Sequence, residues 1–181
     1  MSVIDELRQR NAAFAETRFT PLPLRATLNM TIVTCVDPRV DPAHILGIEL
    51  GEAGIIRNVG GRITPTTLRQ LALLRQLPRQ QAPSSSAPVN HLVVLHHTDC
   101  GIVRLQQYRD QLAEYFGVPD DQLETKAIAD PCAAVKADVA VLAAAPDIPR
   151  GLVVSGLVYD VETGLIDTVV PPTALKDLAG D

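Results

Sequence analysis

The sequence predicts an α/β fold with a single domain, in which a mostly parallel central β-sheet is flanked by helices and has an antiparallel strand at its C-terminal end. Short β-branched runs alternate with helical patterns along the 181 residues, as is typical of parallel sheets. The last two apolar runs are separated only by the turn ETG at 162–164, which indicates a hairpin. The length suits one hydrophobic core, so we expect one domain over residues 1–181.

Caps, breakers and periodicity predict the elements in chain order. A first helix is expected over about 2–17, capped by Ser2, before two prolines break the pattern. The expected strands are 29–36, 53–59, 91–97, 151–161 and 165–170. The expected helices are 41–50, with Asp41 as N-cap and Pro42 in its first turn, and then 66–77, 102–117 and 131–145. Segment 78–89 is rich in Pro and Ser, so we expect a mobile loop there.

Composition excludes several classes of partner. The net charge is −5 and the pI is near 5.3, which argues against nucleic acid and against an anionic membrane surface. Three cysteines, an odd number, do not predict a disulfide framework and favour thiol or metal chemistry in a reducing compartment. The N-terminus is acidic and lacks the apolar core of a signal peptide, and no apolar run is long enough to span a membrane. We therefore expect a soluble, cytoplasmic protein.

Metal-ligand residues follow two of the expected strands. Cys35 ends the first, and His97 and Cys100 end the third. In open α/β sheets, sites gather beyond the carboxyl ends of the strands, so these side chains should meet. Two thiolates and one imidazole with an open position form a known catalytic zinc set. Cys100 also begins a helix, where the dipole favours its thiolate.

An aspartate and an arginine follow Cys35 in the stretch TCVDPRV. Strand alternation would place Cys35, Asp37 and Arg39 on one side if the strand geometry persists. Arg39 could then hold the Asp37 carboxylate through a bidentate pair. An ionised Asp37 could accept a hydrogen bond from zinc-bound water or hydroxide, or it could bind the metal itself as a fourth ligand and close the site.

These motifs resemble the β-class carbonic anhydrases. CVDPR followed by HTDCG resembles that family's Cys-x-Asp-x-Arg and His-x-x-Cys signature, and IIRNVGGRIT resembles its Arg-Asn-Ala-Gly-Gly segment, with Val59 in place of the usual alanine. The form HHTDCG is closest to the short bacterial and archaeal branch. The likeness extends over roughly Asn29 to Val170 and includes GLVYDVETGLI near the end.

The resemblance implies a function and a partner. It implies that Cys35, His97 and Cys100 bind Zn²⁺ and that Asp37 and Arg39 are catalytic residues in the reversible hydration of carbon dioxide to bicarbonate and a proton by zinc-bound hydroxide. It also implies a homodimer, or a dimer of dimers, with the N-terminal helix packed on the partner. The alternatives are a carbonyl sulfide or carbon disulfide hydrolase on the same metal site, a non-catalytic zinc-binding protein, and a thiol redox protein.

Other chemically notable residues have plainer expected roles. We expect His96 to be packed or hydrogen-bonded in the core, Cys132 to be a small core residue, and His44 and His91 to be structural or exposed.

Two features of the predicted loops have two readings each. Gly60 and Gly61 are expected to form a plain turn into a helix, although they could instead direct backbone N–H groups at the site. Asp99 is expected to cap the helix that follows it rather than to act on substrate.

Overall fold

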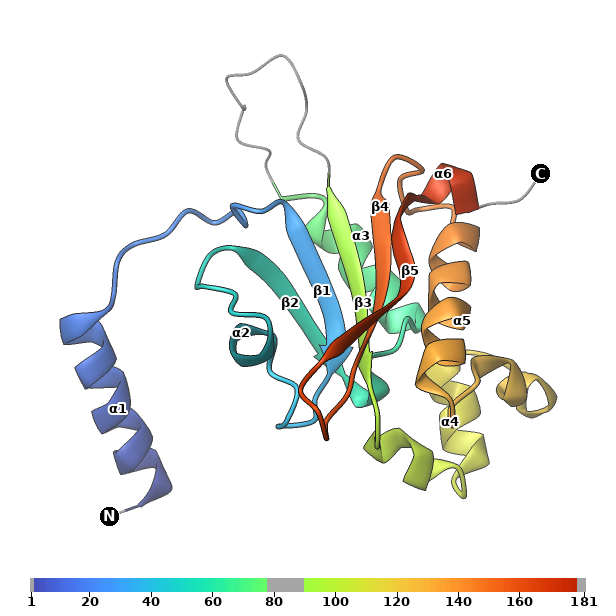
Figure 1. Cartoon of the computed structure of the whole chain (residues 1–181), viewed down its shortest axis with the longest axis horizontal. Helices are drawn as coiled ribbons and strands as arrows, with labels where there is room; N and C mark the ends of the chain where they lie inside the picture. Colours follow the sequence, from blue (N-terminus) through green and yellow to red (C-terminus); the bar gives the residue numbers. More distant parts are fainter. Residues whose placement is uncertain (1, 78–89, 179–181) are drawn as a thin grey trace.

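The β-branched runs pair into one sheet in the computed structural model, which describes residues 2–77 and 90–178. Within these residues, five strands lie in the order β2-β1-β3-β4-β5 (Figure 1). Their bounds are β1 Met30–Cys35, β2 Ala53–Asn58, β3 His91–His97, β4 Val153–Tyr159 and β5 Ile166–Ala174. The pairs β1–β2, β1–β3 and β3–β4 are parallel, whereas β4–β5 is antiparallel. The predicted fold class is therefore confirmed.

The central strands are buried on both faces, as expected of a parallel sheet covered by helices. Val33 and Val94 belong to the cluster that includes residues of α5. The side chains of Ile32, Val93 and Leu95 point to the opposite face of the sheet. There they pack near apolar residues in α2 and just after it. This arrangement sets the register, so that Cys35 pairs with Asn58 and Thr34 with Leu95. The carboxyl ends of β1, β2 and β3 therefore lie at one edge of the sheet.

The helices begin where the sequence places caps and prolines. Ser2 caps α1 through a reciprocal pair of bonds with Asp5, and the Asp41 side chain accepts a hydrogen bond from the Ala43 N–H at the start of α2. The α-helices are α1 Val3–Thr17, α2 Pro42–Ile45, α3 Pro65–Leu74, α4 Arg109–Phe116, α5 Pro131–Ala144 and α6 Leu175–Leu178. Short 3₁₀ turns are η1 Val59–Gly61, η2 Gly101–Leu105 and η3 Asp120–Lys126.

The expected single helix over 102–117 is wrong. The chain forms η2, leaves helical geometry at Tyr108 (φ −101°, ψ 57°), and starts again as α4. The bonds from Gln106 N–H to the Val103 carbonyl and from Tyr108 N–H to the Leu105 carbonyl are i→i+3 bonds, which tighten the turn and do not propagate an α-helix. The first turn is thereby set apart from α4.

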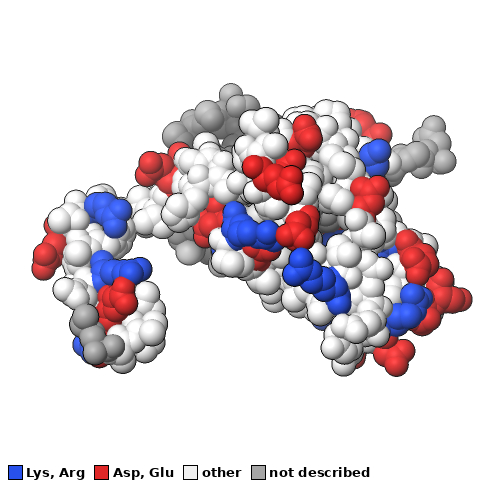
Figure 2. Space-filling view, turned by 60° about the horizontal axis from the view of Figure 1, so that its bottom comes forward, with Lys and Arg blue, Asp and Glu red and all other residues white. Residues whose placement is uncertain are grey.

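Helix α1 lies away from the rest of the described chain and is joined to it by an extended segment (Figures 1 and 2). Within the described structure, none of its residues is buried, and Val3, Ile4 and Leu7 are more than half exposed. None of the helices within 2–77 and 90–178 combines the length and the apolar character that a membrane crossing requires. Figure 2 also shows acidic and basic side chains interspersed over one face.

The expectations for Cys132, for the loop 78–89 and for two histidines have different outcomes. Cys132 is exposed in the first turn of α5 and is not a core residue, because the apolar stripe of that helix is formed by Val135, Val139 and Leu142. The expected mobile loop 78–89 lies outside the described residues. His44 and His91 are exposed, as expected.

Candidate metal centre

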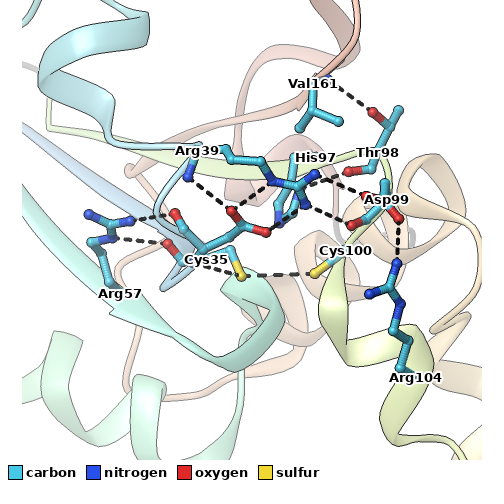
Figure 3. Close-up of polar contacts among 10 residues, drawn as sticks. Cys35, Arg39, Arg57, His97, Thr98, Asp99, Cys100, Arg104 and Val161 are labelled. Atoms are coloured by element: carbon cyan, nitrogen blue, oxygen red, sulfur yellow. Dashed lines mark hydrogen bonds and ion pairs between the residues drawn. The ribbon is translucent and has the colours of Figure 1, made fainter.

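Three potential ligands converge at the carboxyl edge of the sheet. Cys35 is the last residue of β1, His97 is the last residue of β3, and Cys100 follows in the next turn. One ligand atom from each lies within 4.8 Å of the others, and the two sulfur atoms are 3.8 Å apart (Figure 3). The parallel register brings these residues together, as the sequence predicts.

The His97 ring is oriented for coordination. Its Nδ1 lies 2.8 Å from the Thr98 carbonyl oxygen, which can only accept, so Nδ1 carries the hydrogen and Nε2 has a free lone pair. Nε2 is buried and has no hydrogen-bond partner among the described residues. A buried acceptor without a partner is unfavourable unless a ligand satisfies it, and a metal cation would do so.

The pKa values of the two thiols are shifted in opposite directions. A hydrogen bond from the Cys100 thiol lowers the pKa of Cys35 to about 4, against the effect of burial, and the backbone N–H groups of Asp37 and Gly60 contribute. The same bond raises the pKa of Cys100, and burial adds to the rise. The expected helix after Cys100 is a short 3₁₀ turn, η2, so a helix dipole offers little stabilisation to a Cys100 thiolate. Two adjacent thiolates need a cation between them.

The glycine pair packs against the first ligand strand. Gly60 and Gly61 have positive φ values of 77° and 68°. A Cβ atom on Gly61 would lie 2.9 Å from the backbone nitrogen of Cys35, so no larger residue fits without displacing β1. The backbone N–H of Gly60 contributes to the lowered pKa of Cys35. The pair therefore forms a turn ahead of α3, as expected, and the second reading holds in part, because the N–H of Gly60 also acts on Cys35.

Asp37 and Arg39 form a tight pair beside the three ligands. The strand ends at Cys35, so the expected alternation does not persist. Instead a turn closes from Val40 N–H to the Asp37 carbonyl, and the Asp37 carboxylate accepts the backbone N–H of Arg39. Arg39 Nε and Nη2 bind Asp37 Oδ1 and Oδ2 at 3.0 and 2.8 Å. This bidentate pair lowers the pKa of Asp37 to about 2.

Asp99 binds Arg39 from the opposite side and does not cap the helix after it. Among the described residues η2 has no side-chain cap, and its N-cap position is Cys100. Asp99 Oδ2 and its carbonyl oxygen accept Arg39 Nη1 and Nη2 at 2.9 and 3.0 Å (Figure 3). The capping expectation is therefore wrong, because the left-handed backbone of Asp99 (φ 50°) places both oxygens beside Arg39.

Arg57 fixes the backbone of the same loop and was missed from sequence. Its guanidinium donates to the carbonyl oxygen of Cys35 at 3.0 Å (Figure 3). It also donates to the carbonyl oxygen of Asp37 at 2.8 Å and to Asp41 Oδ2 at 3.0 Å. The arginine faces this loop because β2 lies parallel to β1, with Arg57 opposite Thr34. Its place at the start of the RNVGG part of IIRNVGGRIT, the segment that resembles the family, was a usable signal.

A fully buried polar network lies behind the ligands. Asp138 of α5 accepts hydrogen bonds from Arg62 Nε and Nη2, from the Ile63 N–H and from His96 Nε2. Arg62 also stacks on the Phe116 ring at 4.8 Å. The expectation that His96 is a hydrogen-bonded core residue is confirmed. Arg62 and Asp138 were missed, although an aspartate on the apolar stripe of α5 was a usable signal.

The set Cys35, His97 and Cys100 therefore fits a metal ion with a preference for sulfur and nitrogen ligands, of which Zn²⁺ is the usual one. The ligands supply one uncoordinated imidazole nitrogen and two thiols that cannot both ionise without a cation. Asp37 Oδ2 lies 4.0 Å from His97 Nε2, close enough to face the same ion.

Comparison with known proteins places the chain in a family. A family model described as carbonic anhydrase matches residues 30–117. The carbonic anhydrase of Streptococcus mutans has a crystal structure with 36% identity and a TM-score of 0.70, over 93% of this chain and 98% of that one. Beta-carbonic anhydrase 1 of Mycobacterium tuberculosis is 28% identical over 94% of this chain and its own whole length. The carbon disulfide hydrolase of Saccharolobus solfataricus is 28% identical over 88% of this chain and 85% of its own length. The chain belongs to the β-carbonic anhydrase family.

Proposed function

We propose that this member of the β-carbonic anhydrase family catalyses the reversible hydration of carbon dioxide to bicarbonate and a proton, at a zinc ion held by Cys35, His97 and Cys100. The observation that carries the proposal is the convergence of these three ligand atoms within 4.8 Å beside an arginine-held carboxylate. When bound, zinc lowers the pKa of a coordinated water to about 7 and so supplies hydroxide at neutral pH.

In this proposal Asp37 orients the nucleophile. Its pKa of about 2 means that the carboxylate is ionised and can only accept hydrogen bonds. Arg39 binds one edge of this carboxylate, and Oδ2 also faces the ligand cluster. Asp37 therefore accepts the hydrogen of the attacking group and turns its lone pair toward the substrate carbon. The alternative is that Asp37 leaves Arg39 and becomes a fourth ligand, which would close the site.

The partner in this proposal is a second copy of the chain, as a homodimer or a dimer of dimers. An isolated helix of 15 residues is marginal in water, and α1 exposes apolar side chains at Val3, Ile4 and Leu7. A groove on another copy would cover this face. Light scattering of the purified chain tests the assignment, and a monomer at micromolar concentration would contradict it.

We place the enzyme in the cytoplasm. The three cysteines are free, and two of them must be available as thiolates for the metal. An oxidising compartment would convert closely spaced thiols to a disulfide and destroy the site.

The experiment that tests the function is stopped-flow CO₂ hydration on protein of measured zinc content. The wild type should carry one zinc per chain and be active. Cys35→Ser and Cys100→Ser should lose zinc and activity together, because each removes a ligand. Asp37→Ala should keep zinc and lose about a hundredfold or more in kcat. Zinc-loaded wild type without turnover, or full activity in Asp37→Ala, would contradict the proposal.

Carbon disulfide hydrolysis is the second candidate, because a relative with that name matches most of the chain at 28% identity. The same residues would hold the metal, and only access to the site would differ. Parallel assays with carbon disulfide and carbonyl sulfide separate the two. Turnover of a sulfur substrate with no CO₂ hydration would select the second candidate.

A further inference from the structure

Asp99 lies in the turn between His97 and Cys100 and faces the loop that carries Asp37 and Arg39. Its carboxylate Oδ2 accepts Arg39 Nη1 at 2.9 Å, and its carbonyl oxygen accepts Arg39 Nη2 at 3.0 Å. The other carboxylate oxygen lies 3.3 Å from Arg104 Nη2. Figure 3 shows Arg39 and Arg104 on two sides of Asp99.

These contacts occupy the second edge of the Arg39 guanidinium. The edge formed by Nε and Nη2 holds Asp37, and the edge formed by Nη1 and Nη2 holds Asp99. A guanidinium presents its donors in a rigid plane, so a second fixed acceptor restricts rotation of the whole group. With Asp37 alone, Arg39 could swing on its long side chain, which is 46% exposed. With both carboxylates bound, it has one orientation.

The backbone of Asp99 is consistent with this role. Its φ of 50° lies in the left-handed region, which is uncommon for residues other than glycine but is adopted by aspartate and asparagine more readily than by most. A capping role does not account for the conformation, because within the described chain η2 lacks a side-chain cap. The conformation aims the side chain and the carbonyl oxygen of one residue at the same guanidinium.

We infer that Asp99 is a positioning residue, which fixes Arg39 between two carboxylates and thereby holds Asp37 in its arginine-bound orientation beside the ligand cluster. The inference rests on the proposed function for its effect on turnover. The restraint of Arg39 by Asp99 can be tested separately, by a measurement that does not depend on enzymatic turnover. Asp99 also ties the loop after β1, which follows the ligand Cys35, to the loop after β3, which carries the ligand Cys100.

The test compares Asp99→Asn with Asp120→Asn in the zinc-loaded chain. Asparagine tolerates the left-handed backbone, so the first change removes the charge with little strain. Asp120 is the matched control, since it forms a similar exposed pair with Arg109 through Nε and Nη2 at 2.8 and 3.3 Å. The first readout is the ¹⁵N–¹H resonance of Arg39 Nε, assigned by its absence from Arg39→Lys. The second is kcat for CO₂ hydration, with zinc content measured for each variant.

We expect Asp99→Asn to shift or broaden the Arg39 Nε resonance and to lower kcat about tenfold at unchanged zinc content, whereas Asp120→Asn leaves the resonance unchanged and kcat within about twofold. In an Arg39→Lys background, Asp99→Asn should cause no further loss, because lysine cannot bridge both carboxylates.

Three results would overturn the inference: an unchanged Arg39 resonance in Asp99→Asn, loss of zinc from that variant, or an equal loss of activity when Arg39 is already replaced. A wild type without CO₂ hydration would count against the proposed function alone, since the resonance still reports whether Asp99 restrains Arg39.

Discussion

Two of the aspartate–arginine pairs at this end of the sheet, Arg62–Asp138 and Arg39–Asp37, differ in burial rather than in distance. Arg62 and Asp138 approach to 2.8 Å with both side chains 1% exposed. Arg39 and Asp37 also approach to 2.8 Å, but the side chains are 46% and 13% exposed. The two pairs therefore have equal N–O distances but very different exposure to solvent, and this exposure determines what each pair can do.

The buried pair joins segments that are far apart in the sequence. Asp138 of α5 binds the turn after β2 through Arg62 and Ile63, and β3 through His96, next to the ligand His97. Although burial alone would raise the pKa of Asp138, hydrogen bonding to His96 and the charge of Arg62 hold it below its ordinary value. Among the described residues, the side-chain hydrogen bonds of the more exposed pair stay within the loops after β1 and β3, and its carboxylate faces the ligand cluster. The buried pair therefore holds distant segments of the fold together, whereas the other pair places a carboxylate beside the candidate metal ligands.

The largest effect on folding should come from Asp138→Asn. The change leaves the Arg62 charge buried without its counter-charge, and removal of one partner from a buried pair typically costs about 3–5 kcal/mol. We expect a loss of that order in the free energy of unfolding, measured by urea denaturation at equal zinc content and equal protein concentration. Asp120→Asn, in an exposed pair, serves as the control and should change little.

A double variant sharpens this comparison. Arg62→Met with Asp138→Leu removes both buried charges, so it should be less damaging than Asp138→Asn even though His96 and Ile63 lose their acceptor. If the double variant is less stable than the single one, the network matters through its hydrogen bonds rather than through its charges.

At acid pH, the difference in free energy of unfolding between the wild type and Asp138→Asn should become smaller. Because the pKa of Asp138 in the folded state lies below the ordinary 3.8, the native state binds fewer protons than the unfolded chain. The stabilisation is fully present above that ordinary value and is lost as pH falls through the folded pKa. Urea denaturation of chelator-treated protein from pH 6 down to pH 3 measures this difference in free energy of unfolding. We expect the difference to decrease below about pH 4. A difference that is constant over this range would show that the Asp138 charge is not involved.

Much of the fold could be predicted from local patterns. The β-branched runs and the caps at Ser2 and Asp41 are local signals, and they placed the strands and helix starts close to their observed bounds. The break at Tyr108 could not be predicted, because residues 102–117 carry neither glycine nor proline before Gly117. Helix periodicity cannot distinguish i→i+3 from i→i+4 bonding over one turn.

The candidate site was predictable to the extent that its residues form short motifs. Cys35, Asp37, Arg39, His97 and Cys100 follow strand ends, and parallel strands bring their ends together. Arg62 and Asp138 are 76 residues apart, and Asp138 lies outside the motifs quoted from the sequence, so their pairing required the three-dimensional structure. Asp99 was assigned a local role because sequence shows only its neighbours, whereas its partner Arg39 is on another loop.

The smallest effect on folding should come from the same substitution in the other pair, Asp37→Asn. Although Arg39 lowers the pKa of Asp37 to about 2, that guanidinium is half exposed, so water screens the pair and replaces its hydrogen bonds when they are lost. We expect the urea midpoint of the zinc-loaded chain to stay within error of the wild type, while CO₂ hydration falls steeply because the carboxylate no longer accepts the hydrogen of the nucleophile. Comparing the free energies of unfolding of Asp138→Asn and Asp37→Asn therefore measures how much each pair stabilises the fold. A loss of stability in Asp37→Asn comparable to that in Asp138→Asn would mean that exposure does not distinguish them and that the loop after β1 is part of the folding core.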